Sequence, residues 1–236
     1  MSEMTGSRTG GKKPGVLNGQ GVLNGQGMLN GQRVLMMLVG ILLIGMGVAF
    51  YRLSLFGVDS FTCMNLGISG YLGMLFGNWQ LIVNVFLLII VFFTVRHCIG
   101  LGTIINMVFV GYLADFLCWA VKALGILAPG LFMRVGFLLL GTLALSLGCA
   151  LYMEADLGIA PYDSVAFIIT KGTREKVAFR TARVMSDLTV VLVGVGFCLA
   201  AQGELREIVG LGTVVNALGS GLLIQFFREK IERMAQ

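Results

Sequence analysis

Four long stretches of this chain contain no Asp, Glu, Lys or Arg, and this feature limits the fold more than any other. The stretches are residues 34–51, 79–95, 135–153 and 208–227. A helix needs about 20 mostly apolar residues to cross a hydrocarbon core, and each stretch is close to that length. Charged residues make up only 12% of the chain, about half their share in soluble domains. The sequence therefore predicts an all-α, polytopic membrane helix bundle.

The two ends of the chain have a different composition. Residues 1–33 contain the tandem hexapeptides VLNGQG, VLNGQG and MLNGQR, which are too rich in Gly, Asn and Gln to form an apolar core. We expect a disordered cytoplasmic tail there. We expect no cleavable signal peptide, because no short apolar core precedes a small-residue cleavage site. Residues 229–236 are expected to form a second, short cytoplasmic tail.

Two motifs occur twice, which indicates an internal duplication. GLGTIIN at residues 100–106 returns as GLGTVVN at residues 210–216, and FGVDSFT at residues 56–62 corresponds to LGIAPYD at residues 157–163. Each copy then has the same order: a long helix, a break at glycine, a short segment, a second long helix, and a third helix that begins at GLGT. Internal repeats of this kind are typical of transporter folds.

The predicted membrane repeats, residues 34–121 and 131–228, can be arranged in two ways. If the short segment of each repeat crosses the membrane, the bundle has 4+4 segments; if it is re-entrant, the bundle is an inverted 3+3 repeat. Basic residues before the first helix, in the 171–187 loop and after the last helix place these parts in the cytoplasm in both arrangements. The length of segment 58–76 favours eight crossings. A helix over residues 161–170 rises only about 15 Å, so at least the second copy contains a short or broken helix.

Acidic residues beside the two glycine breaks are the main candidates for a binding site. Asp59 and Asp163 would lie at membrane depth, where a carboxylate costs a few kcal/mol unless it faces a cavity or a partner. One interpretation is that they only cap short helices, since Pro161 suits a first helical position. The other is that two helix starts face each other and bind a polar or anionic substrate with their free N–H groups. The predicted substrate-binding residues here are Asp59, Ser60, Pro161, Tyr162 and Asp163.

Polar pairs in the repeated heptads form a second set of candidates. Thr103 and Asn106, and likewise Thr213 and Asn216, are three residues apart and share one helix face. Such residues can hydrogen-bond the two repeats together or line the substrate site, and both interpretations stay open.

Two further acidic residues interrupt apolar stretches. Asp115 is a candidate for proton coupling, since a carboxylate within a membrane helix usually has a functional partner. The alternative is packing near a helix end, with Lys122 two turns away. Asp187 follows a run of basic residues and is expected to form an interfacial ion pair.

The remaining reactive side chains do not form a recognisable catalytic or metal site. The five cysteines are scattered without a Cys-x-x-Cys motif, and the chain contains one histidine, His97. We therefore expect no metal centre, no cofactor, no disulfide framework and no enzymatic function. A nucleic-acid partner is not expected either.

The motif LYMEADLGIAPYDS at residues 151–164, followed by GLGTVVN, resembles the YczE/YyaS/YitT family of bacterial integral membrane proteins. The family's A-(D/N)-L-G-(V/I)-(S/A)-P-(W/Y)-D element matches the first motif, and its G-x-G-T-x-x-N element matches residues 210–216. The first copy departs from the pattern, because Ser60 stands where the family has proline. The resemblance covers about residues 34–228 and implies a multi-pass protein of the bacterial cytoplasmic membrane.

Together these features predict a small secondary transporter or permease with a midplane site between two repeats and both termini in the cytoplasm. The alternative is a membrane partner or regulatory subunit of another complex, without transport activity. Besides the lipid bilayer, the expected partner is a small-molecule substrate that the sequence does not identify. A homo-oligomer or a complex with another membrane protein stays open.

Overall fold

A computed structural model describes residues 31–125, 129–174, 176–177, 179–216 and 221–234. Every regular element in these residues is a helix. The long helices are α1 (Gly31–Ser54), α3 (Phe76–Val95), α4 (Leu101–Ala123), α5 (Leu131–Ala155) and α7 (Phe179–Ala200). The shorter ones are α2 (Ser60–Leu72), the 3-10 turn η1 (Arg96–Cys98), α6 (Pro161–Gly172), α8 (Leu205–Ile208), α9 (Leu211–Val215) and α10 (Gly221–Met234).

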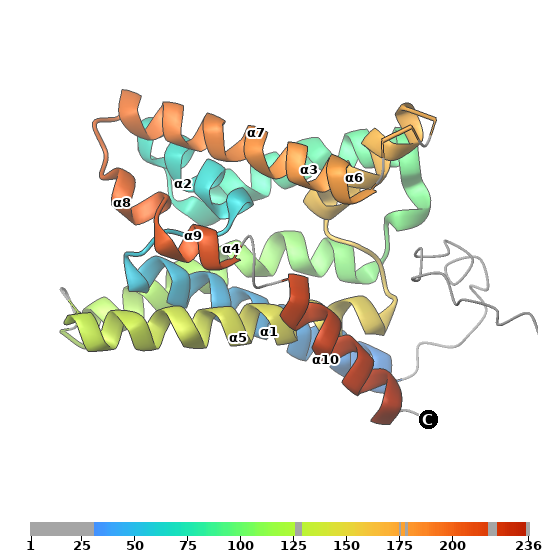
Figure 1. Ribbon diagram of the computed structural model, residues 1–236, viewed down its shortest axis with the longest axis horizontal. Coiled ribbons are helices and arrows are strands. Elements are labelled where there is room, and N and C mark those ends of the chain that lie inside the picture. Colours follow the sequence, from blue (N-terminus) through green and yellow to red (C-terminus); the bar gives the residue numbers. More distant parts are fainter. Residues whose placement is uncertain (1–30, 126–128, 175, 178, 217–220, 235–236) are drawn as a thin grey trace, which may run out of the picture.

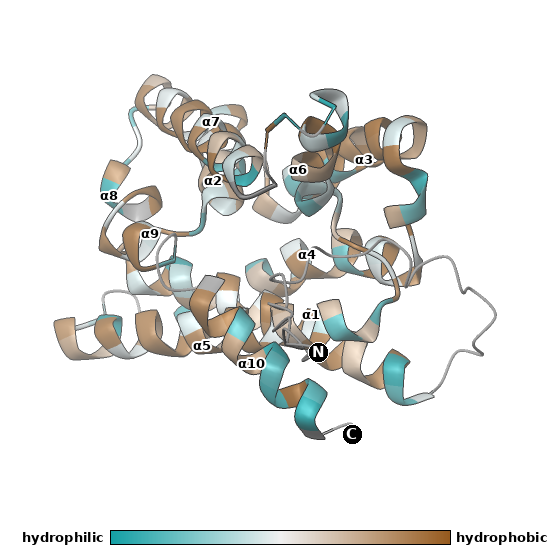
Figure 2. Cartoon of the chain, turned by 45° about the vertical axis from the view of Figure 1, so that its right-hand side comes forward, coloured by the Kyte–Doolittle hydropathy of each residue, from teal (hydrophilic) through white to brown (hydrophobic). Residues whose placement is uncertain are grey.

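Within the described residues, five helices are long and apolar enough to cross a membrane: α1, α3 together with η1, α4, α5 and most of α7. Their outer surfaces carry large apolar side chains, of which Phe93 and Phe132 are 80% and 95% exposed. Figure 2 shows hydrophobic residues along these helices and hydrophilic residues in the last turns of α10. Such a surface suits lipid rather than water, which agrees with the predicted all-α membrane bundle.

The eight crossings favoured by the length of segment 58–76 are not found in the described residues. Helix α2 has 13 residues and α6 has 12, so they rise only about 20 Å and 18 Å, well short of a hydrocarbon core. Segment 58–76 is divided because Gly73 adopts a left-handed conformation (φ 65°) directly after α2. The chain then turns and enters α3 at Phe76.

The helix boundaries at the two ends of the chain differ from those that the sequence predicted. Residues 1–30 lie outside the described part, and residues 31–33 already belong to α1. The stretch 208–227 is shared among α8, α9 and α10, and residues 217–220 within it are not described. Residues 229–234 continue α10.

Helices α1 and α5 pack closely against each other along their length (Figure 1). A Cβ atom on Gly148 would lie 2.8 Å from the carbonyl oxygen of Gly40, and the Tyr51 hydroxyl lies 2.8 Å from Thr142 Oγ1. The contacts proceed forwards along α1 and backwards along α5, so the two helices are antiparallel. Glycine on both surfaces is what allows the two backbones to approach this closely.

The half-length helices α2 and α6 occupy opposite ends of the bundle (Figure 1). Helix α2 lies along α7, where a Cβ atom on Gly67 would collide with the carbonyl oxygen of Gly194. Helix α6 lies against α3, where Lys171 Nζ donates to the Thr94 carbonyl at 2.9 Å. Both helices begin near the middle of the bundle and lead outward.

Non-helical backbone precedes α6, and the first copy of the GLGT heptad binds it. The Gly102 N–H donates to the Leu157 carbonyl at 2.8 Å, and the Ile159 N–H donates to the Cys98 carbonyl at 2.9 Å. Gly158 between them has φ 114°, a conformation that favours glycine. The loop before α6 therefore obtains its hydrogen bonds from the N-terminal half of the chain, residues 31–125.

The loop before α2 is bound in the same way by the second GLGT heptad. The Gly212 N–H donates to the Phe56 carbonyl at 2.6 Å, and the Val58 N–H donates to the Ile208 carbonyl at 3.2 Å. Gly57 between them has φ 92°. Each copy of the heptad thus hydrogen-bonds to the half of the chain to which it does not belong.

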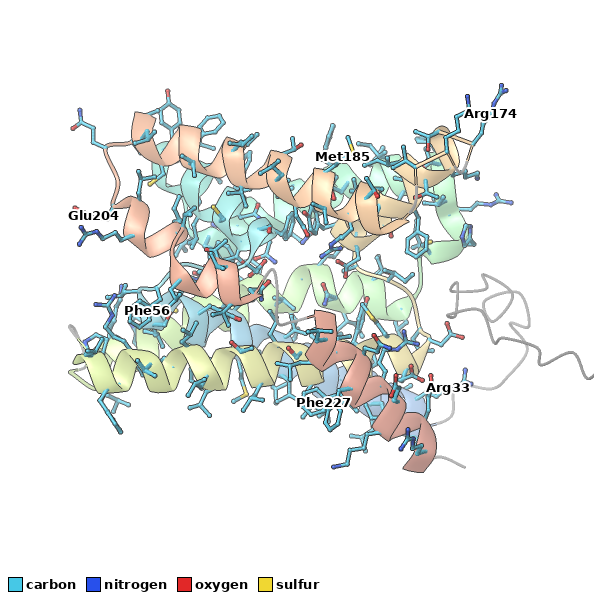
Figure 3. All side chains as sticks on the ribbon, viewed as in Figure 1. Arg33, Phe56, Arg174, Met185, Glu204 and Phe227 are labelled. Carbon is cyan, nitrogen blue, oxygen red and sulfur yellow. The ribbon has the colours of Figure 1, made fainter. Side chains whose placement is uncertain are left out.

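Basic residues gather at one end of the bundle, which we call the basic end. It is formed by the first turn of α1, by η1, by the C-terminal end of α6 and by the last turns of α10. Figure 3 shows Arg33 and Arg174 at this end and Phe56 and Glu204 at the opposite end. The described basic residues of the basic end are Arg33, Arg96, Lys171, Arg174, Lys176, Arg228, Lys230 and Arg233.

The close approach of α1 and α5 predicts a position-specific effect of adding one methyl group. We expect Gly148→Ala to lower the free energy of unfolding by about 1–3 kcal/mol, because its Cβ atom would meet the backbone of α1 at two points 2.8 Å away. Gly136→Ala in the same helix is the control, because nothing lies within 4 Å of its Cβ position. Thermal unfolding of both purified variants in detergent measures the difference, and equal unfolding temperatures would contradict the packing described above.

Candidate functional site

The N-terminal ends of α2 and α6 meet in the middle of the bundle. The ring of Phe61, in the first turn of α2, stacks on the ring of Tyr162 in α6, with centroids 4.5 Å apart and an interplanar angle of 18°. Asp59 starts α2 as its N-cap residue, because its Oδ1 accepts the Thr62 N–H at 3.1 Å. Pro161 starts α6 at the first helical position, where its missing N–H costs no hydrogen bond.

Four side chains beside this junction form a connected polar network, which we call the Arg183 cluster. Arg183 Nη1 of α7 lies 2.5 Å from Asp163 Oδ1, and its Nε lies 3.4 Å from Asp187 Oδ2. The Tyr162 hydroxyl donates to Asp187 Oδ1 at 2.5 Å. The guanidinium also lies over the Tyr162 ring, 4.9 Å from its centroid. One arginine therefore joins two carboxylates and an aromatic ring that belong to two helices.

Carboxylates outnumber cations at this junction. Asp59 lies at the same junction, where it is the N-cap residue of α2. Its second carboxylate oxygen, Oδ2, is buried and has no hydrogen-bond partner among the described residues. Three aspartates therefore lie at this junction, and two of them, Asp163 and Asp187, pair with the one guanidinium of Arg183.

The Arg183 cluster lies well inside the bundle rather than at its rim. Asp187 is about 12 Å beyond the first residue of α7, a helix of 22 residues and about 33 Å. The side chains of Arg183, Asp163 and Asp187 nevertheless keep 35%, 25% and 32% of their surface accessible. Charged groups that are both deep and accessible are characteristic of sites that face a water-filled opening.

The two acidic residues predicted for the site have different partners in the structure. Asp59 caps α2, as the more conservative interpretation of the sequence has it. Asp163 does not cap α6, whose N-cap residue Ala160 makes no side-chain capping bond; it pairs with Arg183 instead. Ser60 is the first residue of α2 and half-buried. The five predicted residues therefore do lie at one junction of two helix starts.

The threonines of the repeated heptads bind backbone and not the Arg183 cluster. Thr103 Oγ1 donates to the Ile159 carbonyl at 2.8 Å, which adds a bond between heptad and loop. Thr213 Oγ1 donates to the Ile208 carbonyl at 3.4 Å within its own segment. Both hydroxyls also accept the N–H of the glycine that begins the heptad.

The asparagines of the heptads lie among the packed helices. Asn216 Nδ2 donates to the Tyr51 hydroxyl at 3.3 Å and so connects the C-terminal half to α1. Asn106 is buried. These positions fit the interpretation of hydrogen bonding between the repeats, and their role in substrate binding stays a prediction.

Asp115, the candidate for proton coupling, lies apart from this junction. Its Oδ1 is 2.7 Å from Arg52 Nη1, and its Oδ2 accepts the Gly77 N–H at 2.7 Å. Asp115 therefore joins α1 to α4 and holds the first turn of α3. Arg52 takes the place that the sequence suggested for Lys122.

Arg183 is the member of this candidate site that the sequence did not predict. The sequence assigned it to a group of basic loop residues, whereas the structure places it in α7 beside Asp163. Arg183 precedes Asp187 by four residues, and Asp187 lies next to the apolar part of α7. This i, i+4 pairing of opposite charges is the sequence signal that could have identified Arg183 as a residue of the helix. The expected ion pair of Asp187 is present, with Arg183 as its partner. Among the described residues, no group of three His, Cys, Asp or Glu side chains could hold a metal ion.

Comparison with known proteins agrees with the helical membrane architecture. Residues 31–229 match the model of a family described as a family of unknown function, DUF6198. The chain belongs to this family. The match covers both halves of the bundle and every residue of the junction between α2 and α6.

Two relatives come from Bacillus subtilis. The protein named uncharacterized membrane protein YczE is 25% identical over 170 residues, 72% of this chain and 73% of its own. The protein named YyaS is 25% identical over 200 residues, 83% of this chain and 92% of its own. A protein from Haemophilus influenzae is 30% identical over 200 residues, 84% of each chain. These names confirm the YczE-like resemblance, and no solved structure matches the chain.

The Arg183 cluster predicts a charge-balance effect. Arg183→Gln leaves Asp163 and Asp187 without their shared partner, and we expect it to lower the free energy of unfolding by about 1–3 kcal/mol. Adding Asp163→Asn to that variant removes one of the two facing charges and should restore part of the loss. Lys230→Gln, which removes an exposed cation from α10, is the control.

Thermal unfolding of the single and double variants in detergent measures this coupling. If Arg183→Gln unfolds at the same temperature as Lys230→Gln, or if Asp163→Asn makes the variant still less stable, the described ion pair does not contribute to the fold.

Proposed function

We propose that this membrane protein is a small secondary transporter or permease, with the Arg183 cluster and the junction of α2 and α6 as its substrate site. The observation that carries the proposal is a charged, accessible cluster at the point where two half-length helices begin, deep in an otherwise apolar bundle. Irregular backbone and ionisable groups at such depth are tolerated where they line a cavity, and transporters use helix starts of this kind to bind substrate.

We further propose an inverted repeat of three crossings in each half, an arrangement that suits a transporter. Gly45 of α1 packs on Leu113 of α4, and the Cys118 thiol of α4 donates to the Ala49 carbonyl at 3.8 Å. These contacts advance in the same direction along both helices, so α1 and α4 are parallel. We infer that α3, which is long enough to cross, returns the chain between them and that α2 is re-entrant. The antiparallel pair α1 and α5 would then be the corresponding first helices of two oppositely oriented repeats.

Matched contacts in the two halves also favour a duplicated architecture. In each half, a heptad glycine and the residue two positions before the heptad form one backbone hydrogen bond each with the loop before the half-length helix of the other half. The last helix of each half is tied to the first by an ion pair, Arg52 with Asp115 at 2.7 Å and Glu154 with Arg228 at 2.7 Å. Equivalent contacts at both ends are what a pseudo-twofold axis in the membrane plane would produce.

We place the protein in the bacterial cytoplasmic membrane with its basic end in the cytoplasm. The start of α1 and the end of α10 both belong to this end, so both termini would be cytoplasmic. The positive-inside rule supports this orientation, because the described basic residues of the connecting segments are concentrated there. In this arrangement α6 enters from the cytoplasmic side and α2 from the outer side.

The geometry suggests how access to the site would alternate. The Phe61–Tyr162 stack closes the space between the two helix starts. Rocking of one half against the other about the paired loops would separate these rings without breaking the long helices. Since no nucleotide-binding domain is recognisable in the sequence, movement would be coupled to an ion gradient or to the substrate gradient alone.

The inverted arrangement predicts which loops are reachable from outside. We expect Leu124→Cys to react with a membrane-impermeant maleimide in intact spheroplasts and His97→Cys to react only in inverted vesicles. The unmodified chain is the blank, because four of its cysteines are buried and Cys149 is only partly accessible. Eight crossings would reverse both results, so the labelling pattern separates the two arrangements.

The transport proposal predicts that the Asp163 charge is required for movement of substrate. In proteoliposomes tested with a panel of amines, amino acids, organic acids and inorganic ions, we expect at least one solute to move with the natural protein. Asp163→Asn should slow that flux at least about tenfold, because the transition between states depends on this charge. Asp156→Asn is the matched control, since Asp156 is exposed and asparagine also tolerates its left-handed conformation (φ 52°).

The same experiment addresses the other functions. A melting temperature that falls in Asp163→Asn, with no solute moved by any variant, would contradict transport and favour a partner or regulatory subunit, which should co-purify with another membrane protein. Consumption of a solute in detergent, with no gradient present, would indicate an enzyme instead.

A further inference from the structure

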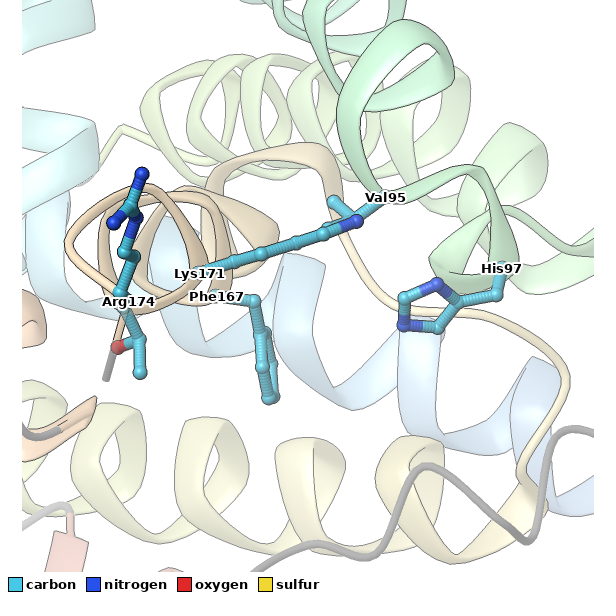
Figure 4. A pocket seen from close by; sticks show the side chains of 6 residues that line it. Val95, His97, Phe167, Lys171 and Arg174 are labelled. Carbon is cyan, nitrogen blue, oxygen red and sulfur yellow. The ribbon is translucent and has the colours of Figure 1, made fainter.

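An open pocket with cationic side chains at its edge lies at the basic end, between the end of α3 and the end of α6 (Figure 4). It is a cavity of about 480 Å³, a size that suits a small ligand or a headgroup. Its lining residues are Val95, His97, Phe167, Thr170, Lys171 and Arg174. None of them belongs to the Arg183 cluster, and the proposed transport function does not use them.

The charge of this cavity is positive, and its cations have free donors. Lys171 uses one N–H for the Thr94 carbonyl, at 2.9 Å, which leaves two of its three donors. The side chain of Arg174 is exposed and forms no hydrogen bond or ion pair with the described residues. Residues 171–176 contain three basic residues, Lys171, Arg174 and Lys176, and one acidic residue.

The cavity lies at the level where a membrane has its headgroups. The candidate crossing Phe76–Cys98 ends in it, since Val95 and His97 are lining residues. Phe92 lies three residues before Val95, on the neighbouring exposed surface of α3, and is 55% exposed. The cations at the pocket suit the headgroup of a phospholipid, and the exposed apolar surface of α3 beside it suits the acyl chains.

We propose that this cavity binds the phosphate of an anionic phospholipid, with Lys171 and Arg174 as its cationic contacts. The acyl chains would extend from the cavity along α3 toward Phe92. Basic pockets between membrane helices are suited to anionic headgroups, and each cation near the surface contributes a similar share of the attraction. A bound lipid would also join α6 to α3 at the end where Lys171 donates to the Thr94 carbonyl of α3.

The test uses the full chain purified in an uncharged detergent. Native mass spectrometry titrates it with dioleoyl-phosphatidylglycerol, with dioleoyl-phosphatidylcholine and with inorganic phosphate. We expect the anionic lipid to bind at least about tenfold more tightly than the zwitterionic one. Arg174→Gln should weaken that binding about fivefold, and Lys171→Gln with Arg174→Gln about 25-fold. Lys122→Gln, at the opposite end, is the control and should bind as the natural protein does.

Arg174→Gln alone keeps the test decisive if loss of Lys171 unfolds the protein, because Arg174 makes no contact that the fold needs. Equal affinity for the two lipids would overturn the proposal, and so would unchanged lipid binding in Arg174→Gln. If inorganic phosphate binds as tightly as the anionic lipid and loses the same affinity in both variants, the cavity is a site for a free anion and the lipid assignment is wrong.

Discussion

The structure depends on one constraint: backbone groups at membrane depth must find hydrogen bonds within the protein, because lipid offers none. The loops before α2 and α6 are not helical, so their backbone N–H and C=O groups cannot form the hydrogen bonds of a helix. Each obtains two backbone hydrogen bonds from the other half of the chain. One comes from the N–H of a heptad glycine, Gly102 or Gly212, and the other goes to the carbonyl two residues before the heptad, that of Cys98 or Ile208. Neither half can complete its own interior alone, so the two broken helices are positioned by the association of the halves.

This mutual pairing places two helix starts face to face, but it does not make them equal. On one side Tyr162 and Asp163 of α6 join Arg183 and Asp187 of α7. On the other side Phe61 begins α2, and the first half has no charge in the corresponding positions. The charged side chains therefore concentrate on the side of α6 and α7. In the proposed transporter, this asymmetric placement would let one set of charges be exposed alternately to each side of the membrane.

Some partners could be anticipated from the chain and others could not. Asp59 and Asp163 lie beside glycine breaks in apolar surroundings, which is a local signal, and the structure brings both to one junction. The partner of Asp115 was not accessible to the same reasoning. Lys122 is close in sequence, yet parallel packing of α1 on α4 brings Arg52 to 2.7 Å. Proximity along a helix competes with packing between helices, and here packing decides.

The sequence by itself determined that this chain is a helical membrane protein with two related motifs in each half, because hydropathy, length and repetition are properties of the chain alone. It also located the glycine breaks and the acidic residues next to them. Only the tertiary structure decided that α2 stops at Leu72, that Arg183 turns inward to Asp163, and that each heptad serves the opposite half. These outcomes depend on the direction in which the helices pack and on which backbone groups lack a hydrogen-bond partner. Neither feature can be derived from a short segment of the sequence.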